Sequence, residues 1–290
     1  MRRLSLGLLA AACTIALSPI ASAAPVTYNW TGFYAGWNAG HSWGRSETSM
    51  PFTDALTGAT LNPINTRANV NGLIGGLQAG YNWQTNPSWV LGFETDIQAS
   101  AQSGRSRGFC GGGGITDALV NSACVPGHIG DTDPFNVAAL PVTSVLEQKL
   151  EWFGTFRGRV GPTITPGLLA YVTGGLAYGH VSTTNTISGT NITGANGTNT
   201  SVLTPVSATF SSSETRVGWT AGAGFEGLLG GNWTGKIEYI YVDLGHVSGA
   251  FTTPIVTNSG AFLISRFNSH ITDNILRIGL NYKFGAPAAP

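Results

Sequence analysis

Eight segments of this chain alternate between apolar and polar residues with a period of two, and this pattern narrows the choice of fold more than any other feature. Successive side chains of a β-strand point to opposite faces, so strict alternation is typical of a strand whose two faces meet different surroundings. The sequence therefore predicts an all-β fold, with strands over residues 33–43, 73–84, 89–102, 146–160, 168–180, 215–228, 233–242 and 270–284.

Charged side chains within these segments share one face, opposite the apolar face that carries seven of the eight Trp. Five carboxylates and seven bases nearly balance, and unpaired charges away from water are costly. We therefore expect them to form ion pairs inside a narrow lumen. The residues are Glu94, Asp96, Lys149, Glu151, Arg157, Arg159, Arg216, Glu226, Lys236, Glu238, Arg277 and Lys283.

The connections between the predicted strands alternate in length. Residues 85–88, 161–167 and 229–232 form short connections, whereas the other four run about 25 to 40 residues, far beyond the usual ~4 to 6. Short periplasmic turns and long extracellular loops are typical of an outer-membrane barrel. The prediction is one domain, a transmembrane antiparallel up-and-down β-barrel of eight strands, or of ten if 137–145 or 201–210 form an extra hairpin.

The first 23 residues have the three parts of a secretory signal peptide. Arg2 and Arg3 precede an apolar run over 4–17, and the small-residue site 21–23 follows. We expect cleavage between Ala23 and Ala24, which leaves 24–290 as the mature barrel. The mature part holds no apolar stretch near the roughly 20 residues that a membrane-spanning helix needs, so strands are the expected way across a membrane.

Two cysteines remain after cleavage, Cys110 and Cys124, in a segment rich in Gly, Asp and Pro. Because the chain leaves the reducing cytoplasm, a disulfide bond between them is the simplest interpretation. A zinc site is the weaker alternative, since only His128 lies nearby and a structural zinc needs four ligands.

Both ends of the mature chain resemble one known family. The stretch 29–36 (NWTGFYAG) with 38–40 (NAG), and the last predicted strand 274–284 (NILRIGLNYKF), resemble the outer-membrane immunogenic proteins of alphaproteobacteria, small porin-family surface antigens related to OmpA-like barrels. The resemblance implies an eight-stranded barrel in the cell outer membrane with no agreed chemistry. Leu280, Tyr282 and Phe284 would be its barrel-assembly signal, although family members usually end at that aromatic residue and six residues follow it here.

Composition and motifs favour a structural role over an enzymatic one. Formal net charge is zero, which gives no basic patch for nucleic acid. The glycine pattern over 222–227 matches a dinucleotide fingerprint, but another strand follows where that motif needs a helix. We expect no catalytic residue, cofactor or metal site. The expected partners are outer-membrane lipid, lipopolysaccharide, and the export and barrel-assembly machinery.

Two other functions stay open. The first is a narrow diffusion porin. The second is a surface binding protein whose loops hold haem, a metal, or a host or environmental ligand. His41, His246 and His270 are expected on neighbouring strand ends, where they could form such a site, although no ligand spacing is evident.

Overall fold

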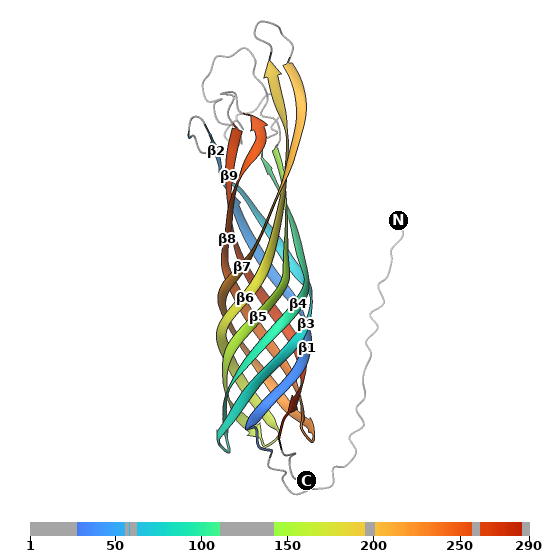
Figure 1. The fold of residues 1–290 in the computed structure, drawn as a ribbon, viewed down its shortest axis with the longest axis vertical. Coiled ribbons are helices and arrows are strands. Elements are labelled where there is room, and N and C mark those ends of the chain that lie inside the picture. Colours follow the sequence, from blue (N-terminus) through green and yellow to red (C-terminus); the bar gives the residue numbers. More distant parts are fainter. Residues whose placement is uncertain are drawn as a thin grey trace, which may run out of the picture.

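A computed structural model describes residues 28–55, 58, 63–110, 142–194, 201–256 and 262–285 (Figure 1). Almost all of these residues lie in antiparallel strands. No helix in the described ranges is long and apolar enough to cross a membrane. The strands are β1 (Gly32–Met50), β2 (Phe52–Asp54), β3 (Ile64–Asn86), β4 (Trp89–Cys110), β5 (Val142–Thr165), β6 (Leu168–Gly194), β7 (Ser201–Gly230), β8 (Trp233–Val256) and β9 (Phe262–Lys283).

Eight of the strands close into a ring, which confirms the predicted fold class. Each strand pairs with the next along the chain, and β1 pairs with β9 to complete the barrel. The short β2 follows β1 and pairs with β9. The ten-stranded alternative is wrong for residues 201–210, because they continue β7 and pair with β6; 142–145 begin β5, and 137–141 lie outside the described residues.

Three tight connections join the strands at one end of the barrel, which we call the short-turn end. Pro87 and Ser88 join β3 to β4, Pro166 and Gly167 join β5 to β6, and Gly231 and Asn232 join β7 to β8. Gly231 has a φ of 55°, a left-handed conformation that favours glycine. The three short connections therefore lie where the sequence predicted them.

Toward the other end the strands run well beyond their predicted limits. Strands β6 and β7 stay paired from Leu168↔Gly227 as far as Gly194↔Ser201, across most of a segment predicted as a long loop. The connections after the first, fifth and seventh predicted strands are therefore shorter than expected. Along the upper parts of β6 and β7 the outward positions are mostly Ser and Thr, such as Ser182, Thr184 and Ser211, rather than apolar residues. The contrast between the two faces is therefore weak, and the sequence alone predicts a loop there.

Above the ring the sheet separates along two lines. Among the described residues, β7 pairs with β8 only from Gly230↔Trp233 to Trp219↔Asp243, and β3 pairs with β4 only as far as Asn71↔Ser103. The upper strands thus form two sheets, β3-β1-β9-β8 with β2 beside β9, and β4-β5-β6-β7. We call this region the extension and the two lines the β3/β4 seam and the β7/β8 seam.

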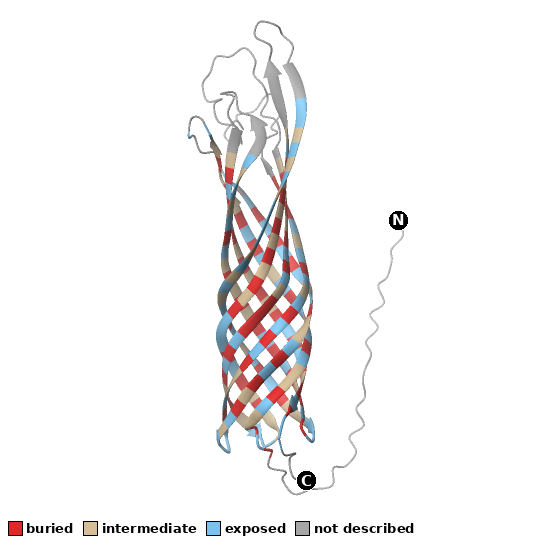
Figure 2. Ribbon diagram, in the orientation of Figure 1, coloured by how far each residue is buried: buried red, intermediate tan, exposed pale blue. Residues whose placement is uncertain are grey.

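The two faces of the barrel wall are those that the alternation predicted (Figure 2). Apolar side chains such as Leu77, Val172 and Ile278 point outward and are exposed, while polar and charged side chains line the interior and are buried. Lys149 and Glu151 are the exception, because both are exposed on the outer side. A β-bulge between Leu150 and Trp152 inserts one residue into β5 and reverses the phase above it.

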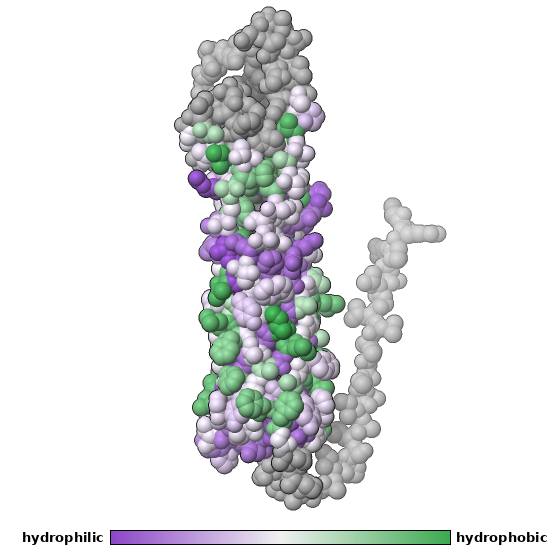
Figure 3. Space-filling view, viewed as in Figure 1, coloured by the Kyte–Doolittle hydropathy of each residue, from purple (hydrophilic) through white to green (hydrophobic). Residues whose placement is uncertain are grey.

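Exposed apolar side chains on all eight ring strands form a belt around the lower part of the barrel. On the face shown in Figure 3, a hydrophilic band lies above this belt. The lower rim of the belt is rich in aromatic contacts. Tyr81 packs 4.6 Å from Trp83, and Tyr282 lies 5.0 Å from Trp233 and 5.4 Å from Phe284, measured between ring centroids. Such a belt with an aromatic rim is the outer surface expected of a barrel in lipid.

Two predictions fall outside the described residues. The signal peptide, with its cleavage site at Ala23 and Ala24, lies within 1–27. Cys110 is the last residue of β4, but its predicted partner Cys124 lies within 111–141. Both stay predictions.

Candidate functional site: a lumen filled in layers

The middle of the lumen holds a network of fully buried ion pairs centred on Arg157. Its guanidinium lies 2.5 Å from Glu94, 3.1 Å from Asp96 and 2.8 Å from Glu238, measured from nitrogen to carboxylate oxygen. Arg277 projects from β9, on the opposite side of the lumen from β5, and its guanidinium lies 2.9 Å from Asp96 and 2.7 Å from Glu238. Charges on β4, β5, β8 and β9 are therefore joined across the axis of the barrel.

Arg159 extends this network toward the short-turn end. It donates a hydrogen bond of 2.6 Å to Glu226 and one of 3.0 Å to the hydroxyl of Tyr34, and it lies 4.0 Å above the ring of Tyr171. The Tyr34 phenol packs against Gly80, where a side chain would collide with it. Small residues at such points leave room for the large groups that fill the lumen.

Positive and negative charges balance within the buried layer. Lys236 lies 2.7 Å from Glu94, and its direct neighbour across β7 and β8 is Glu226. This layer, which we call the ionic layer, contains four bases and four acids: Arg157, Arg159, Lys236, Arg277, Glu94, Asp96, Glu226 and Glu238. Charges removed from water are tolerated only when paired and hydrogen-bonded, and this balance meets that condition.

A second layer closes the lumen at the short-turn end. The segment before β1 turns into the barrel, so that Trp30 is 1% exposed and its indole donates to the carbonyl of Pro166. Tyr28 packs edge-on against Trp30, with the Lys283 ammonium 4.6 Å from its ring centre. Burial, and then the nearby Glu226 carboxylate, raises the pKa of Tyr28 to about 12, so this phenol stays neutral.

A third layer is apolar and spans the upper part of the ring and the extension above it. It contains side chains from β1, β2, β3, β5, β6, β8 and β9, among them Met50, Phe153, Ile187, Leu244 and Phe267. Within this layer, between Ile271 and Ile275 along the inner face of β9, lies the buried carboxylate of Asp273. It accepts hydrogen bonds from Ser42 and, at 2.8 Å, from Gln102.

Four of the predicted lumen charges lie outside the network. Lys149 and Glu151 face outward, which corrects their assignment. Arg216 is half-buried and pairs with Glu214 at 2.7 Å instead. Lys283 donates to the carbonyl of Asn29 at the short-turn end. The proposed assembly residues Leu280, Tyr282 and Phe284 lie on the outer face at the end of the closing strand, and the Phe284 amide donates to the carbonyl of Phe33 in β1.

Sequence reasoning missed several residues that fill the lumen. The alternation predicts strands at Tyr34 and Tyr171 but does not assign either residue to the charged network, and Trp30 lies before the first predicted strand. Tyr34 does share a face with Gly36 and Asn38, and that inward phase could have indicated its role. No signal in the sequence marks Trp30, because its burial depends on how the chain enters the barrel.

The histidines do not form a metal centre in the part of the chain that the structure describes. His246 and His270 stack with ring centroids 4.6 Å apart, and His270 lies 3.1 Å from Asp243, whereas His41 stacks on Trp43. No group of three or more His, Cys, Asp or Glu among the described residues is arranged to hold a metal ion.

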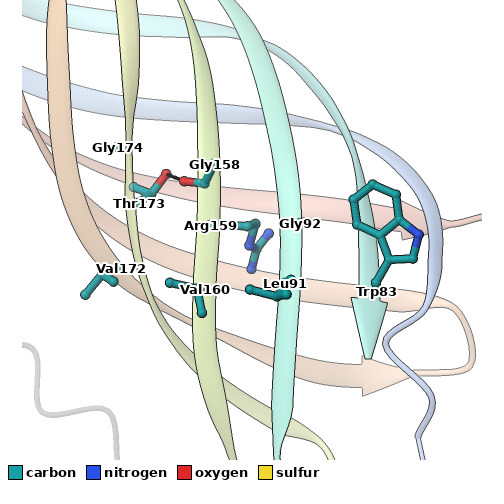
Figure 4. Close-up of a pocket in the computed structure, with 9 residues that line it drawn as sticks. All are labelled: Trp83, Leu91, Gly92, Gly158, Arg159, Val160, Val172, Thr173 and Gly174. Atoms are coloured by element: carbon teal, nitrogen blue, oxygen red, sulfur yellow. Dashed lines mark hydrogen bonds between the residues drawn. The ribbon is translucent and has the colours of Figure 1, made fainter. Parts of the chain in front are cut away.

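A shallow groove of about 510 Å³ lies across β4, β5 and β6, near the lower end of the belt (Figure 4). Its sides include the outward residues Leu91, Val160 and Val172, and Gly158 and Gly174 leave space between them. Arg159 reaches it only from the lumen side. The groove therefore belongs to the apolar outer surface and not to the filled lumen.

A closed ring with an apolar exterior and a charged interior defines a transmembrane β-barrel. The chain belongs to the outer membrane protein beta-barrel domain family, whose model matches residues 9–284. It is 35% identical over 264 residues to the 31 kDa outer-membrane immunogenic protein of Brucella melitensis, covering 91% of this chain and 88% of the relative. The 25 kDa outer-membrane immunogenic protein of Brucella abortus is 25% identical, over 89% and 80%. The protein therefore resides in the outer membrane.

Solved structures with the same general form are more distant. The outer membrane protein OprG of Pseudomonas aeruginosa is 13% identical, with a TM-score of 0.44 over 90% of this chain and 100% of that one. Ail, the attachment invasion locus protein of Yersinia pestis, is 11% identical, with a TM-score of 0.32 over 87% and 99%.

Proposed function

We propose that this protein is a non-enzymatic structural component of the outer membrane that holds a strand extension at the cell surface. The observation that carries the proposal is the filled lumen, in which Arg157 is 0% and Arg277 is 1% exposed. An eight-stranded barrel has an interior just wide enough for side chains. Here those side chains form three stacked layers, so the barrel serves as an anchor.

The same burial argues against catalysis in the lumen. The carboxylates of Glu94 and Glu238 could act as acid and base only if a substrate reached them, and both are at most 2% exposed. Both carboxylates also accept hydrogen bonds from buried bases, Glu238 from Arg157 and Arg277 and Glu94 from Lys236, which hold them in fixed positions.

We place the short-turn end in the periplasm and the extension outside the cell. Barrels of this class have short periplasmic turns and larger structures at the surface. Single cysteines at Thr186 in the extension and at Leu229 by a short turn test this orientation. We expect a membrane-impermeant maleimide to label T186C and not L229C on intact cells, in a background without Cys110 and Cys124.

Conductance distinguishes this proposal from a narrow porin. We expect the refolded protein to show at most small, infrequent openings in a planar bilayer, because an open path would have to cross all three layers. A general porin refolded and inserted in the same way is the positive control. Large, steady channels from the unmodified protein would refute the structural role and favour the porin.

A further inference from the structure

The β7/β8 seam leaves two strand edges without partners. Above Trp219↔Asp243 the described residues of the two strands form no backbone pairs, although β7 continues to Ser201 and β8 to Val256. The other edge of each strand is paired, β7 with β6 and β8 with β9. Backbone donors and acceptors therefore face the seam along both strands.

Side chains bridge the seam where backbone hydrogen bonds do not. The rings of Phe210 and Phe251 stack with centroids 4.4 Å apart, and Phe251 packs against the apolar layer beside Phe267. None of the β7 residues 206–213 is buried, whereas Ile187, the β6 partner of Ala208, is 0% exposed. The edge of β7 is thus open to solvent next to an apolar core.

The two seams differ in how their edges are protected. Natural proteins block free strand edges with charged residues or proline, because such edges recruit other strands. The β3/β4 seam follows this rule, with exposed Arg67, Arg105 and Arg107 on its edges. The β7/β8 seam carries such residues only toward the ends of its described edges, with Pro205, Glu214 and Arg216 on β7 and Pro254 on β8. The stretches 206–213 and 247–253 contain no Asp, Glu, Lys, Arg or Pro.

We propose that the β7/β8 seam is a binding site for an extended, uncharged segment of another polypeptide, which adds as a strand to the free edge of β7. Only a polypeptide backbone offers donors and acceptors at the spacing of a strand edge, and apolar side chains of the added strand would reach Phe210 and Phe251. This inference rests on the surface exposure proposed above and names the class of partner.

A second copy of this chain fits the edge less well. A twofold axis along the membrane normal would place two β7 edges side by side and running in the same direction, and parallel pairing is slightly less stable per residue than antiparallel pairing. A separate extended segment can pair antiparallel with the edge, so it is the occupant that fits better.

Peptide binding tests the proposal. The probe is a fluorescent peptide with the sequence of residues 244–252, the strand opposite the β7 edge, and its fully N-methylated form is the negative probe. Anisotropy is measured with the full mature chain in lipid nanodiscs. We expect the unmodified probe to bind and the N-methylated probe, which cannot donate backbone hydrogen bonds, to bind at least about tenfold more weakly.

Lysines on the edge should abolish this binding, and a matched pair of variants separates the edge from general effects of charge. T209K/S211K places two lysines on the open edge, while T184K/T186K places them on the direct β6 neighbours and removes the same two side-chain hydrogen bonds. We expect at least about a tenfold loss of affinity for the first variant only.

Each other outcome overturns the proposal. The edge is not the site if the unmodified probe fails to bind or if the N-methylated probe binds equally well. The same conclusion follows if both lysine variants lose affinity equally. Oligomers of the unmodified protein that T209K/S211K abolishes would assign the edge to a second copy. Conductance tests the membrane part separately, so the proposed function and this inference can fail independently.

Discussion

Arg157 donates to three carboxylates from two sides of the lumen, and no water-exposed group competes for it. Arg105 forms one ion pair with Glu147, and its side chain is 59% exposed. The two arginines are only one strand apart in the sheet, yet their surroundings differ completely. A buried pair leaves an uncompensated charge when one partner is removed, whereas an exposed pair is replaced by water.

We therefore expect Arg157→Leu to lower the free energy of unfolding by about 3 to 5 kcal/mol. Arg105→Leu, the matched control, should lower it by at most about 1 kcal/mol. Urea unfolding of both variants in the same lipid vesicles measures the difference. Equal effects would mean that water reaches the ionic layer.

The cysteines allow a second test at this scale. A bond between Cys110 and Cys124 would close a loop of about 15 residues and stabilise that loop by up to ~3 kcal/mol. We expect thiol titration of the exported, unreduced protein in denaturant to find no free thiol. Two free thiols per chain would contradict the bond.

Individual strands differ in how far their sequence predicts them. The alternation placed Glu94, Arg157 and Glu238 on the inner face correctly, because a two-residue period fixes the phase of a regular strand. It failed for Lys149 and Glu151, since no residue type announces the bulge that reverses the phase of β5. The seams could not be predicted, because hydrogen bonds between two strands depend on both partners and on how far each has twisted.

The backbone amides of β7 should exchange hydrogen at different rates above and below the point where the pairing of β7 with β8 ends. Amides in 204–213, with one edge free, should exchange faster than those in 220–228, which are paired on both sides. Residues 182–188 of β6 lie at the same level as the free edge but are paired on both sides, and they should stay protected. Mass spectrometry of peptides from the folded protein measures all three. Equal protection throughout β7 would show that the seam is closed in solution.

The whole molecule combines a ring without free edges and an extension that, in the described part of the chain, has four, on β3, β4, β7 and β8. Closure by β1 and β9 leaves the membrane part no edge at which unfolding can begin. We expect the folded protein to resist SDS at room temperature and to migrate differently on a gel after boiling. Identical migration of boiled and unboiled samples would contradict a closed barrel.

The ionic layer also constrains the order in which the strands of the barrel can fold. Glu94 and Arg157 belong to the first four strands of the ring, and Glu238 and Arg277 to the last two. Without the last hairpin the layer would hold three carboxylates, Glu94, Asp96 and Glu226, against two guanidiniums, Arg157 and Arg159. A partly folded barrel would therefore bury a carboxylate without its counter-charge, which is costly. Completion of the hairpin β8–β9 supplies Lys236 and Arg277 together with Glu238, and the layer then holds four bases and four acids. Folding should therefore be all-or-none, and no stable intermediate that lacks the last hairpin should accumulate.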